Sequence, residues 1–234
     1  MDHEHPAWTA LLRQYVHDGE VDYAGLKARG QPELTAYLRS LEAPGPGEYA
    51  PFTREQRLAF WMNVYNAYTV QLILDHYPLK SIRRIGWLPL AAFRARFIPL
   101  RVLGGQETLS LWQVEHTHLR RELKDPRIHF AIVCASRSCP KLRAEAYRAS
   151  EVDAQLEDAA RGFVRDSFRN RVDPARGKAQ VSRIFKWYQG DFERDGRTLG
   201  EYIAQYAEPA QAEVLRKQGS RVGFLGYDWS LNGR

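Results

Sequence analysis

Apolar residues recur at helical spacing along the first forty residues of the chain. Two sets each share one helix face: Trp8, Leu11, Leu12 and Tyr15, and then Leu34, Tyr37, Leu38 and Leu41. The run Pro44-Gly45-Pro46-Gly47 interrupts this pattern. The spacing therefore predicts two helices ahead of residue 50, in a helical N-terminal extension that packs on the rest of the protein.

A segment rich in apolar residues, from Leu58 to about His76, predicts a long buried helix. Thr53 and Gln56 have the spacing of a capping box, and Pro78 is expected to end the helix. Apolar residues occupy most of the circumference of this helix. A helix of this kind belongs at the centre of a domain.

A second apolar run, from Ile128 to Cys134, includes several β-branched residues and predicts a buried strand. Ser138 and Pro140 follow it with the residue types of a helix start, so we expect a short helix from Cys139 to Tyr147. The other elements do not alternate as βαβ units. We expect one α+β domain, with helices packed on a small, mostly antiparallel sheet.

The composition is that of an ordinary globular domain. The chain has 234 residues, of which 44% are hydrophobic and 26% charged. No apolar run approaches the roughly 20 residues of a membrane-spanning helix, so we expect no transmembrane segment. Residues 1–6 lack the features of a secretory leader, although a leader removed beforehand would leave the same start. A periplasmic or secreted location follows if a leader was removed, and a cytoplasmic one otherwise.

The number and spacing of the cysteines limit the kinds of site that they can form. Cys134 and Cys139 are the only cysteines, which is too few for a disulfide framework. Tetrahedral zinc needs four ligands, and no second Cys or His pair at a suitable spacing accompanies them. We expect no metal and no cofactor. The pair is then a thiol site, a local disulfide or two core residues.

Positive charge is concentrated in one segment. The formal net charge is +6, and residues 79–105 contain six basic residues and no Asp or Glu. This excess predicts a surface for an anionic partner, with Lys80, Arg83 and Arg84 as candidate ligands; the alternative is a solvated basic loop. No helix-turn-helix, zinc-finger or RNA-binding signature points to a specific nucleic acid.

Cys139 is the candidate nucleophile. At the start of the predicted helix it would meet unpaired backbone N–H groups and the positive end of the helix dipole. Both favour the thiolate, and the same N–H groups could hold an oxyanion. Ser138 would cap this helix. The alternative is that Cys139 is a small buried apolar residue.

A histidine usually partners a thiol nucleophile. His116, beside Glu115, lies on a predicted helix from Ser110 to Leu123 that packs along the predicted strand. This packing could bring His116 towards Cys139. An asparagine could orient the imidazole. Asn63, or alternatively Asn66, is available on the buried helix; otherwise these amides tie loops to that helix.

Two further residues leave other assignments open. His129 begins the predicted strand, about 17 Å from its far end, which favours a core or strand-edge histidine. Cys134 ends that strand near Cys139. The two thiols could form a disulfide or act as attacking and resolving groups.

Six stretches of the chain resemble the domain-of-unknown-function 547 family, in the same order. They are LAFWMNVYNAYTVQLIL (58–74), YPLKSI (77–82), VEHTHLR (114–120), DPRIHFAIVCASRSCPKLRAEAY (125–147), SRIFKWYQGDF (182–192) and YDWSLN (227–232). The resemblance implies a family domain over residues 51–234, preceded by the N-terminal extension over residues 1–50. Bacterial members often carry secretory leaders, and some plant and animal members are joined to glutaredoxin-like modules.

Three functions remain open. The first is a cysteine-dependent hydrolase or acyl transferase that acts on an amide or ester bond of a peptide or small molecule. Its fold would be broadly like papain or transglutaminase, with His and Cys in rearranged order. The second is a non-catalytic binding module for an anionic partner. The third is a thiol redox protein that uses Cys134 and Cys139.

Overall fold

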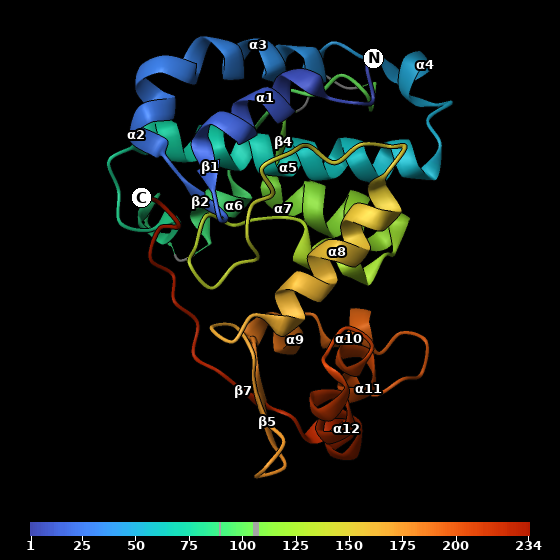
Figure 1. The fold of residues 1–234 in the computed structure, drawn as a ribbon. Coiled ribbons are helices and arrows are strands. Elements are labelled where there is room, and N and C mark those ends of the chain that lie inside the picture. Colours follow the sequence, from blue (N-terminus) through green and yellow to red (C-terminus); the bar gives the residue numbers. More distant parts are fainter. Residues whose placement is uncertain (89, 105–107) are drawn as a thin grey trace.

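A computed structural model describes residues 1–88, 90–104 and 108–234 (Figure 1). The N-terminal part of the chain consists of helices and one short hairpin. The elements are α1 (Pro6–Tyr15), β1 (Val16–His17), β2 (Glu20–Val21), α2 (Tyr23–Gly25), the π-helix η1 (Leu26–Gly30), α3 (Gln31–Glu42) and α4 (Pro46–Tyr49). Helices α1 and α3 are the two that the apolar spacing predicts. The stacked rings of Trp8 and Tyr37 join them, with centroids 5.4 Å apart.

Helix α5 (Arg54–His76) confirms the predicted central helix. It begins at the Thr53 capping box, where the Gln56 N–H donates to Thr53 Oγ1 at 3.2 Å. Its side chains are buried along most of its length, in one apolar core with those of α1 and α3. In Figure 1, α5 lies between these N-terminal helices and the elements that follow it.

The segment after α5 consists of short elements. They are the 3₁₀-helix η2 (Ile82–Arg84), α6 (Ala91–Arg94), β3 (Arg96–Ile98), β4 (Leu109–Ser110), α7 (Leu111–Gln113), the π-helix η3 (Val114–Leu123) and the 3₁₀-helix η4 (Pro126–Phe130). The helix predicted from Ser110 to Leu123 is therefore present, but most of it is wound as a π-helix. Helix η3 packs against α5.

Two predictions for the cysteine segment are wrong. Residues 128–134 are not a strand: they form the end of η4 and then irregular backbone. Residues 139–147 are not a helix either. The apolar run is buried as predicted, yet its backbone pairs with the Asn66 side chain and not with a neighbouring strand. We call residues 131–140 the cysteine loop.

The remaining elements lie in the lower part of Figure 1. They are α8 (Val152–Arg165), β5 (Arg171–Asp173), β6 (Lys178–Val181), α9 (Arg183–Trp187), α10 (Gln189–Phe192), α11 (Leu199–Ala204), α12 (Pro209–Gln218), the 3₁₀-helix η5 (Gly219–Arg221) and β7 (Gly223–Phe224). A second apolar cluster fills the space between them. After β7 the chain returns to the cysteine loop as an extended segment, residues 225–234.

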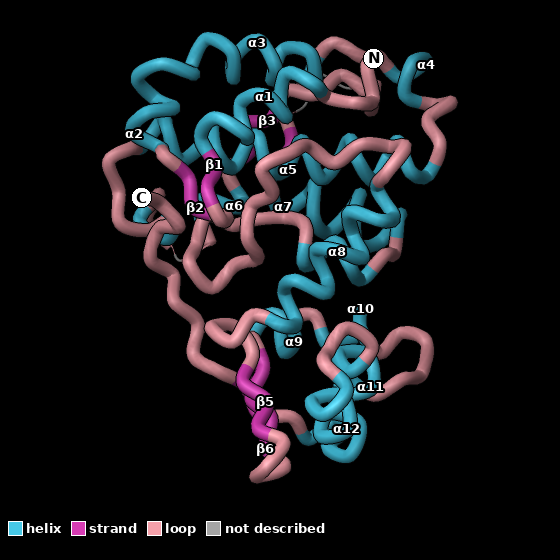
Figure 2. Tube along the Cα trace, viewed as in Figure 1, coloured by secondary structure: helices cyan, strands magenta, loops and turns pink. Residues whose placement is uncertain are grey.

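The strands make up a small part of the molecule (Figure 2). Strands β1–β2, β3–β4 and β5–β6 pair antiparallel, and β7 adds to β6 in parallel. The protein is a single α+β domain, and the strands among its described residues lie in three small sheets and not in one. Within the described residues, no helix combines the length and apolarity needed to cross a membrane.

Candidate functional site

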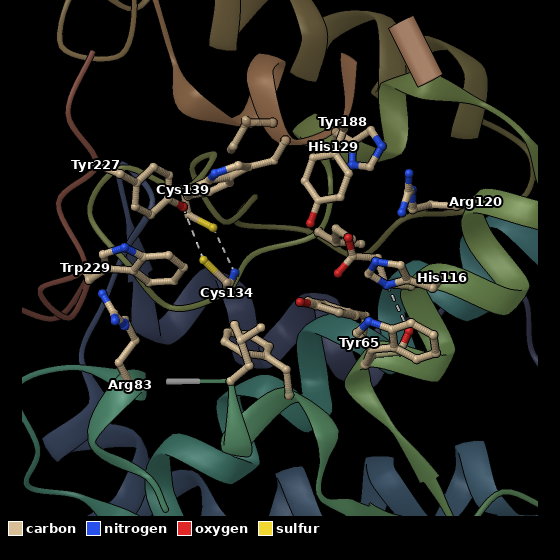
Figure 3. A pocket seen from close by; sticks show the side chains of 17 residues that line it. Tyr65, Arg83, His116, Arg120, His129, Cys134, Cys139, Tyr188, Tyr227 and Trp229 are labelled. Atoms are coloured by element: carbon tan, nitrogen blue, oxygen red, sulfur yellow. Dashed lines mark hydrogen bonds between the residues drawn. The ribbon is translucent and has the colours of Figure 1, made fainter. Parts of the chain in front are cut away.

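A pocket of about 540 Å³ opens between η3, the cysteine loop and the chain's last segment (Figure 3). Both cysteines line it, together with Glu115, His116 and His129. Its walls are largely aromatic: Tyr65, Phe93, Trp112, Trp187, Tyr188, Tyr227 and Trp229. With Arg83, six of the residues that the sequence singled out therefore line one cavity, although the secondary structure around them differs from the prediction.

The sulfur of Cys139 accepts a hydrogen bond from the backbone N–H of Cys134, with 2.9 Å between nitrogen and sulfur. Burial alone would raise the pKa of Cys139. Hydrogen bonds from the Cys134 thiol, the Tyr227 hydroxyl and the Cys134 N–H outweigh burial and lower the pKa to about 7. The stabilising N–H group therefore comes from the loop and not from a helix start.

The Cys134 thiol lies against Cys139 and stays protonated. Burial and the neighbouring Cys139 raise the pKa of Cys134 well above its usual value. Its sulfur lies 3.2 Å from Ser136 Oγ and 3.3 Å from the Tyr227 hydroxyl. Both cysteines are free thiols. Negative charge in this pair therefore resides on Cys139, because Cys134 and Tyr227 act as donors to it.

Long-range contacts give the cysteine loop its shape. Arg169 donates from Nε to the Cys139 carbonyl at 2.6 Å and from Nη2 to the Arg137 carbonyl at 2.8 Å. Ser138 Oγ does not cap a helix; it accepts the Asp228 N–H at 2.8 Å. Ala135 is held at a φ of 56°, a left-handed conformation that is unfavourable for alanine.

His116 lies across the pocket from the two thiols (Figure 3). Its ring stacks on Trp112 at 4.4 Å, and its Nδ1–H donates to the Trp112 carbonyl at 3.1 Å. Burial and the nearby charge of Arg120 lower the pKa of His116. The imidazole is thus neutral near pH 7, with Nε2 able to accept a proton. Among the described residues, His116 makes no hydrogen bond to either cysteine.

Glu115 is a buried carboxyl with spare hydrogen-bonding capacity. Its Oε1 has no partner among the described residues. Burial raises the pKa of Glu115 to about 7, against the opposing effect of Tyr188, Arg120 and Tyr65. Near neutral pH this group can therefore either donate or accept a hydrogen bond.

His129 is buried and lines the same pocket. Its Nε2–H donates to Asp191 Oδ2 at 2.8 Å, and its ring stacks on Tyr188 at 3.9 Å. Burial lowers the pKa of His129 to about 4, despite the adjacent carboxylate. His129 is therefore a neutral hydrogen-bond donor that holds Asp191.

The two asparagines of α5 make structural contacts. Asn63 pairs with the backbone of Tyr147: its Nδ2 donates to the carbonyl at 2.7 Å, and its Oδ1 accepts the N–H at 3.0 Å. Asn66 makes the same kind of pair with Ala131 and Val133. Neither lines the pocket. Their geometry is that of loop ties and does not place an amide beside His116.

The predicted anion ligands do not form one cluster around the pocket. Arg83 lies at the pocket wall, with its guanidinium 5.2 Å from the Trp229 ring centroid. Lys80 and Arg84 are exposed and do not line the pocket. In the part of the chain that the structure describes, no three His, Cys, Asp or Glu side chains are grouped as a metal site requires.

Sequence reasoning missed several residues of the site: Arg120, Arg169, Tyr188, Asp191 and Tyr227. The stretches that contain Tyr188, Asp191 and Tyr227 have the composition of packed turns and strands, because aromatic rings dominate them. The one available signal is Asp191, an acidic residue between aromatic neighbours in a buried turn.

The fold and site define a small α+β domain with a thiol pair in an aromatic pocket. Residues 49–164 match a family model described as "Protein of unknown function, DUF547". Residues 49–164 of the chain belong to this family, as the resemblance in the sequence implied. The matched residues include both cysteines and His116, whereas Tyr188, Asp191 and Tyr227 lie beyond them. No curated protein and no solved structure matches the chain.

Proposed function

We propose that the protein is a cysteine-dependent hydrolase or acyl transferase that acts on an amide or ester bond. The observation that carries this proposal is the hydrogen bond from the Cys134 N–H to Cys139 Sγ, inside a pocket that also holds His116. A thiolate is the nucleophilic form of cysteine, and a pKa of about 7 leaves Cys139 about half ionised at neutral pH.

In the proposed reaction, Cys139 Sγ attacks the substrate carbonyl carbon. A C–S bond forms, the C–N or C–O bond breaks, and the leaving group takes up a proton. Water or another acceptor then attacks the thioester, loses a proton and regenerates the thiolate. The Tyr227 hydroxyl lines the pocket, 3.3 Å from the Cys134 sulfur, and is a candidate donor for the oxyanion.

The position of His116 suggests that it acts in the second step of the reaction and not in the ionisation of Cys139. The loop and Tyr227 already lower the pKa of Cys139, so the histidine is not needed to remove the thiol proton. His116 faces the thiols across the pocket, so a bound substrate would lie between the imidazole and the thiols. Its unprotonated Nε2 suits it to accept a proton from the attacking water or acceptor.

A panel of activated esters and peptide amides tests this function. We expect turnover of a responsive substrate, with a thioester-linked acyl group on Cys139 in the intact mass spectrum. Cys139→Ala should abolish the turnover, and His116→Gln should lower it by about 10²–10⁴-fold. Cys134→Ser is the matched control, because it keeps the backbone N–H that serves Cys139. Turnover that survives in Cys139→Ala would contradict the proposal.

The second thiol favours a redox function as the alternative. Cys134 and Cys139 are close enough for their side chains to interact. A disulfide oxidant such as oxidised glutathione could take two electrons from them, with loss of two protons and formation of an S–S bond. Equilibration in glutathione buffers, followed by mass spectrometry, measures whether this bond forms. A pair that stays reduced in every such buffer excludes the redox function.

A further inference from the structure

A second cleft, of about 630 Å³, adjoins the thiol pocket. The two cavities share three wall residues: Trp112, His116 and Arg120. Trp112 and His116 form the stacked pair described above, and Arg120 extends from η3 beside them (Figure 3). A ligand that reaches past this shared wall would therefore contact both cavities.

The charge of the second cleft is strongly positive. Its wall carries four cationic side chains, Arg120, Arg121, Lys124 and Arg194, and one carboxylate, Asp191. Three donors already bind that carboxylate. Arg120 Nε donates to it at 2.6 Å, Arg194 Nη2 at 2.7 Å and His129 Nε2 at 2.8 Å. Asp191 therefore cannot neutralise the whole cluster.

Arg120 is held rigidly with its outer nitrogens unused. Asp191 binds its Nε, and Tyr188 lies under the guanidinium, 4.9 Å from its carbon to the ring centroid. Neither terminal nitrogen of Arg120 makes a hydrogen bond among the described residues. A fixed guanidinium with two free N–H edges matches the geometry of a carboxylate or phosphate oxygen pair.

Within the described residues, the side chains of Arg121 and Lys124 make no contact that would account for two positive charges at this place. They lie at the carboxyl end of η3, where basic residues often pair with unsatisfied carbonyl groups. Here other arginines bind those carbonyls: Arg54 donates to Leu123 and Arg194 to Lys124. The side chains of Arg121 and Lys124 are exposed and make no hydrogen bond or ion pair within the described residues.

We propose that this cleft, which we call the basic cleft, binds an anionic group of the substrate, a carboxylate or a phosphate. The assignment rests on the proposed function only in taking the bound molecule as the substrate of Cys139. It moves the anion site from the predicted Lys80–Arg84 segment to η3 and α10. The reacting carbonyl would then lie at the thiols, and the acidic group would lie on the far side of the Trp112–His116 stack.

The test uses Cys139→Ser protein, so that binding is measured without catalysis. Inorganic phosphate is titrated at low ionic strength and followed by the width of its ³¹P NMR signal. We expect saturable broadening. The double variant Arg121→Glu/Lys124→Glu should weaken phosphate binding by about tenfold or more, since contacts to charged groups contribute about 1.5–3 kcal/mol each. Competition by succinate distinguishes a carboxylate site from one restricted to phosphate.

Two further double variants carry the same change in net charge. Lys178→Glu/Arg216→Glu alters exposed residues of β6 and α12, away from the basic cleft. Lys80→Glu/Arg84→Glu alters the segment predicted from the sequence. Unchanged phosphate binding in both, with circular dichroism showing that every variant is folded, supports the proposal. Equal loss in either one, or an absence of saturable broadening, overturns it without bearing on the chemistry of Cys139.

Discussion

The backbone N–H of Cys134 lies 2.9 Å from the sulfur of Cys139 and donates a hydrogen bond to it, in addition to those from the Cys134 thiol and the Tyr227 hydroxyl. The pKa of Cys139 falls to about 7, whereas that of Cys134 rises well above its usual value. The pair therefore carries one proton at neutral pH in a large fraction of molecules. The irregular backbone of the cysteine loop thus gives the two thiols opposite shifts in pKa.

The first prediction concerns thiol labelling. Iodoacetamide should alkylate Cys139 with a rate that rises through a midpoint near pH 7, while Cys134 reacts only at much higher pH. Mass spectrometry of digested protein separates the two sites. Cys139→Ser should leave Cys134 unreactive at pH 7. Labelling of both thiols only after urea is added would show that Cys139 is an inert core residue.

The second prediction isolates the Tyr227 hydroxyl. This group donates to the thiol pair, so Tyr227→Phe should raise the pKa of Cys139 by about one unit, the equivalent of one hydrogen bond to a charged group. Tyr147→Phe is the matched control. Its hydroxyl is also buried, but it has no hydrogen-bond partner and does not line the pocket. An equal shift in both variants would point to general loosening of the fold.

The third prediction compares the two asparagines of α5. Each makes two hydrogen bonds to buried backbone, so Asn63→Ala and Asn66→Ala should each lower the free energy of unfolding by about 2–4 kcal/mol. Only Asn66 holds the cysteine loop. The labelling midpoint of Cys139 should therefore move in Asn66→Ala and stay unchanged in Asn63→Ala. The opposite result would show that Asn63, and not Asn66, controls the conformation of the cysteine loop.

The fourth prediction concerns stability in mild acid. Burial lowers the pKa of both His5 and His129 to about 4 in the folded protein. From pH 6.5 down to about 4, the unfolded chain therefore binds protons that the folded chain excludes. As the pH falls through this window, each histidine should lower the stability by up to about 1.4 kcal/mol per pH unit. The raised pKa of Glu115 acts in the opposite direction, so variants of the histidines are needed to isolate their contribution.

Urea unfolding at pH 7.5 and pH 5 measures this dependence. His129→Gln should be less stable than the wild type at pH 7.5, because it loses its contact with Asp191, but it should show a smaller drop between the two pH values. His5→Gln should reduce the drop by a similar amount without disturbing the pocket. A drop that is unchanged in both variants would assign the acid sensitivity to other groups.

Local sequence signals predicted the parts of the fold that local interactions determine. The Thr53 capping box and the apolar circumference of residues 58–76 specify α5 almost residue by residue. In the run from Ile128 to Cys134, the apolar residues correctly predicted burial but did not determine the backbone conformation. Asn66, 67 positions before Val133, satisfies the backbone there, so no strand partner is needed.

The candidate site could be predicted in part. Cys139 and His116 do line one pocket, and they could be predicted because a thiol and a histidine are residue types that commonly act together. The supposed helix after Ser138 is absent because the Ser138 hydroxyl binds Asp228, 90 positions away. Arg120 and Asp191 were missed for a related reason. Their pairing joins η3 to α10, and nothing in either stretch alone indicates the other.

Because of the extended segment after β7, the thiol site is expected to open at a lower temperature than the one at which the whole protein unfolds. Residues 228–232 pair with Ala135, Arg137 and Ser138 through backbone groups, outside any regular sheet. Segments with few regular contacts open at a lower free energy than the core does. On warming, this segment is expected to detach before the helices melt, and the hydroxyl of Tyr227 would leave with it. The pKa of Cys139 would then return towards that of an ordinary thiol while the rest of the protein is still folded. The alkylation rate of Cys139 would therefore detect a local opening that global melting curves do not detect.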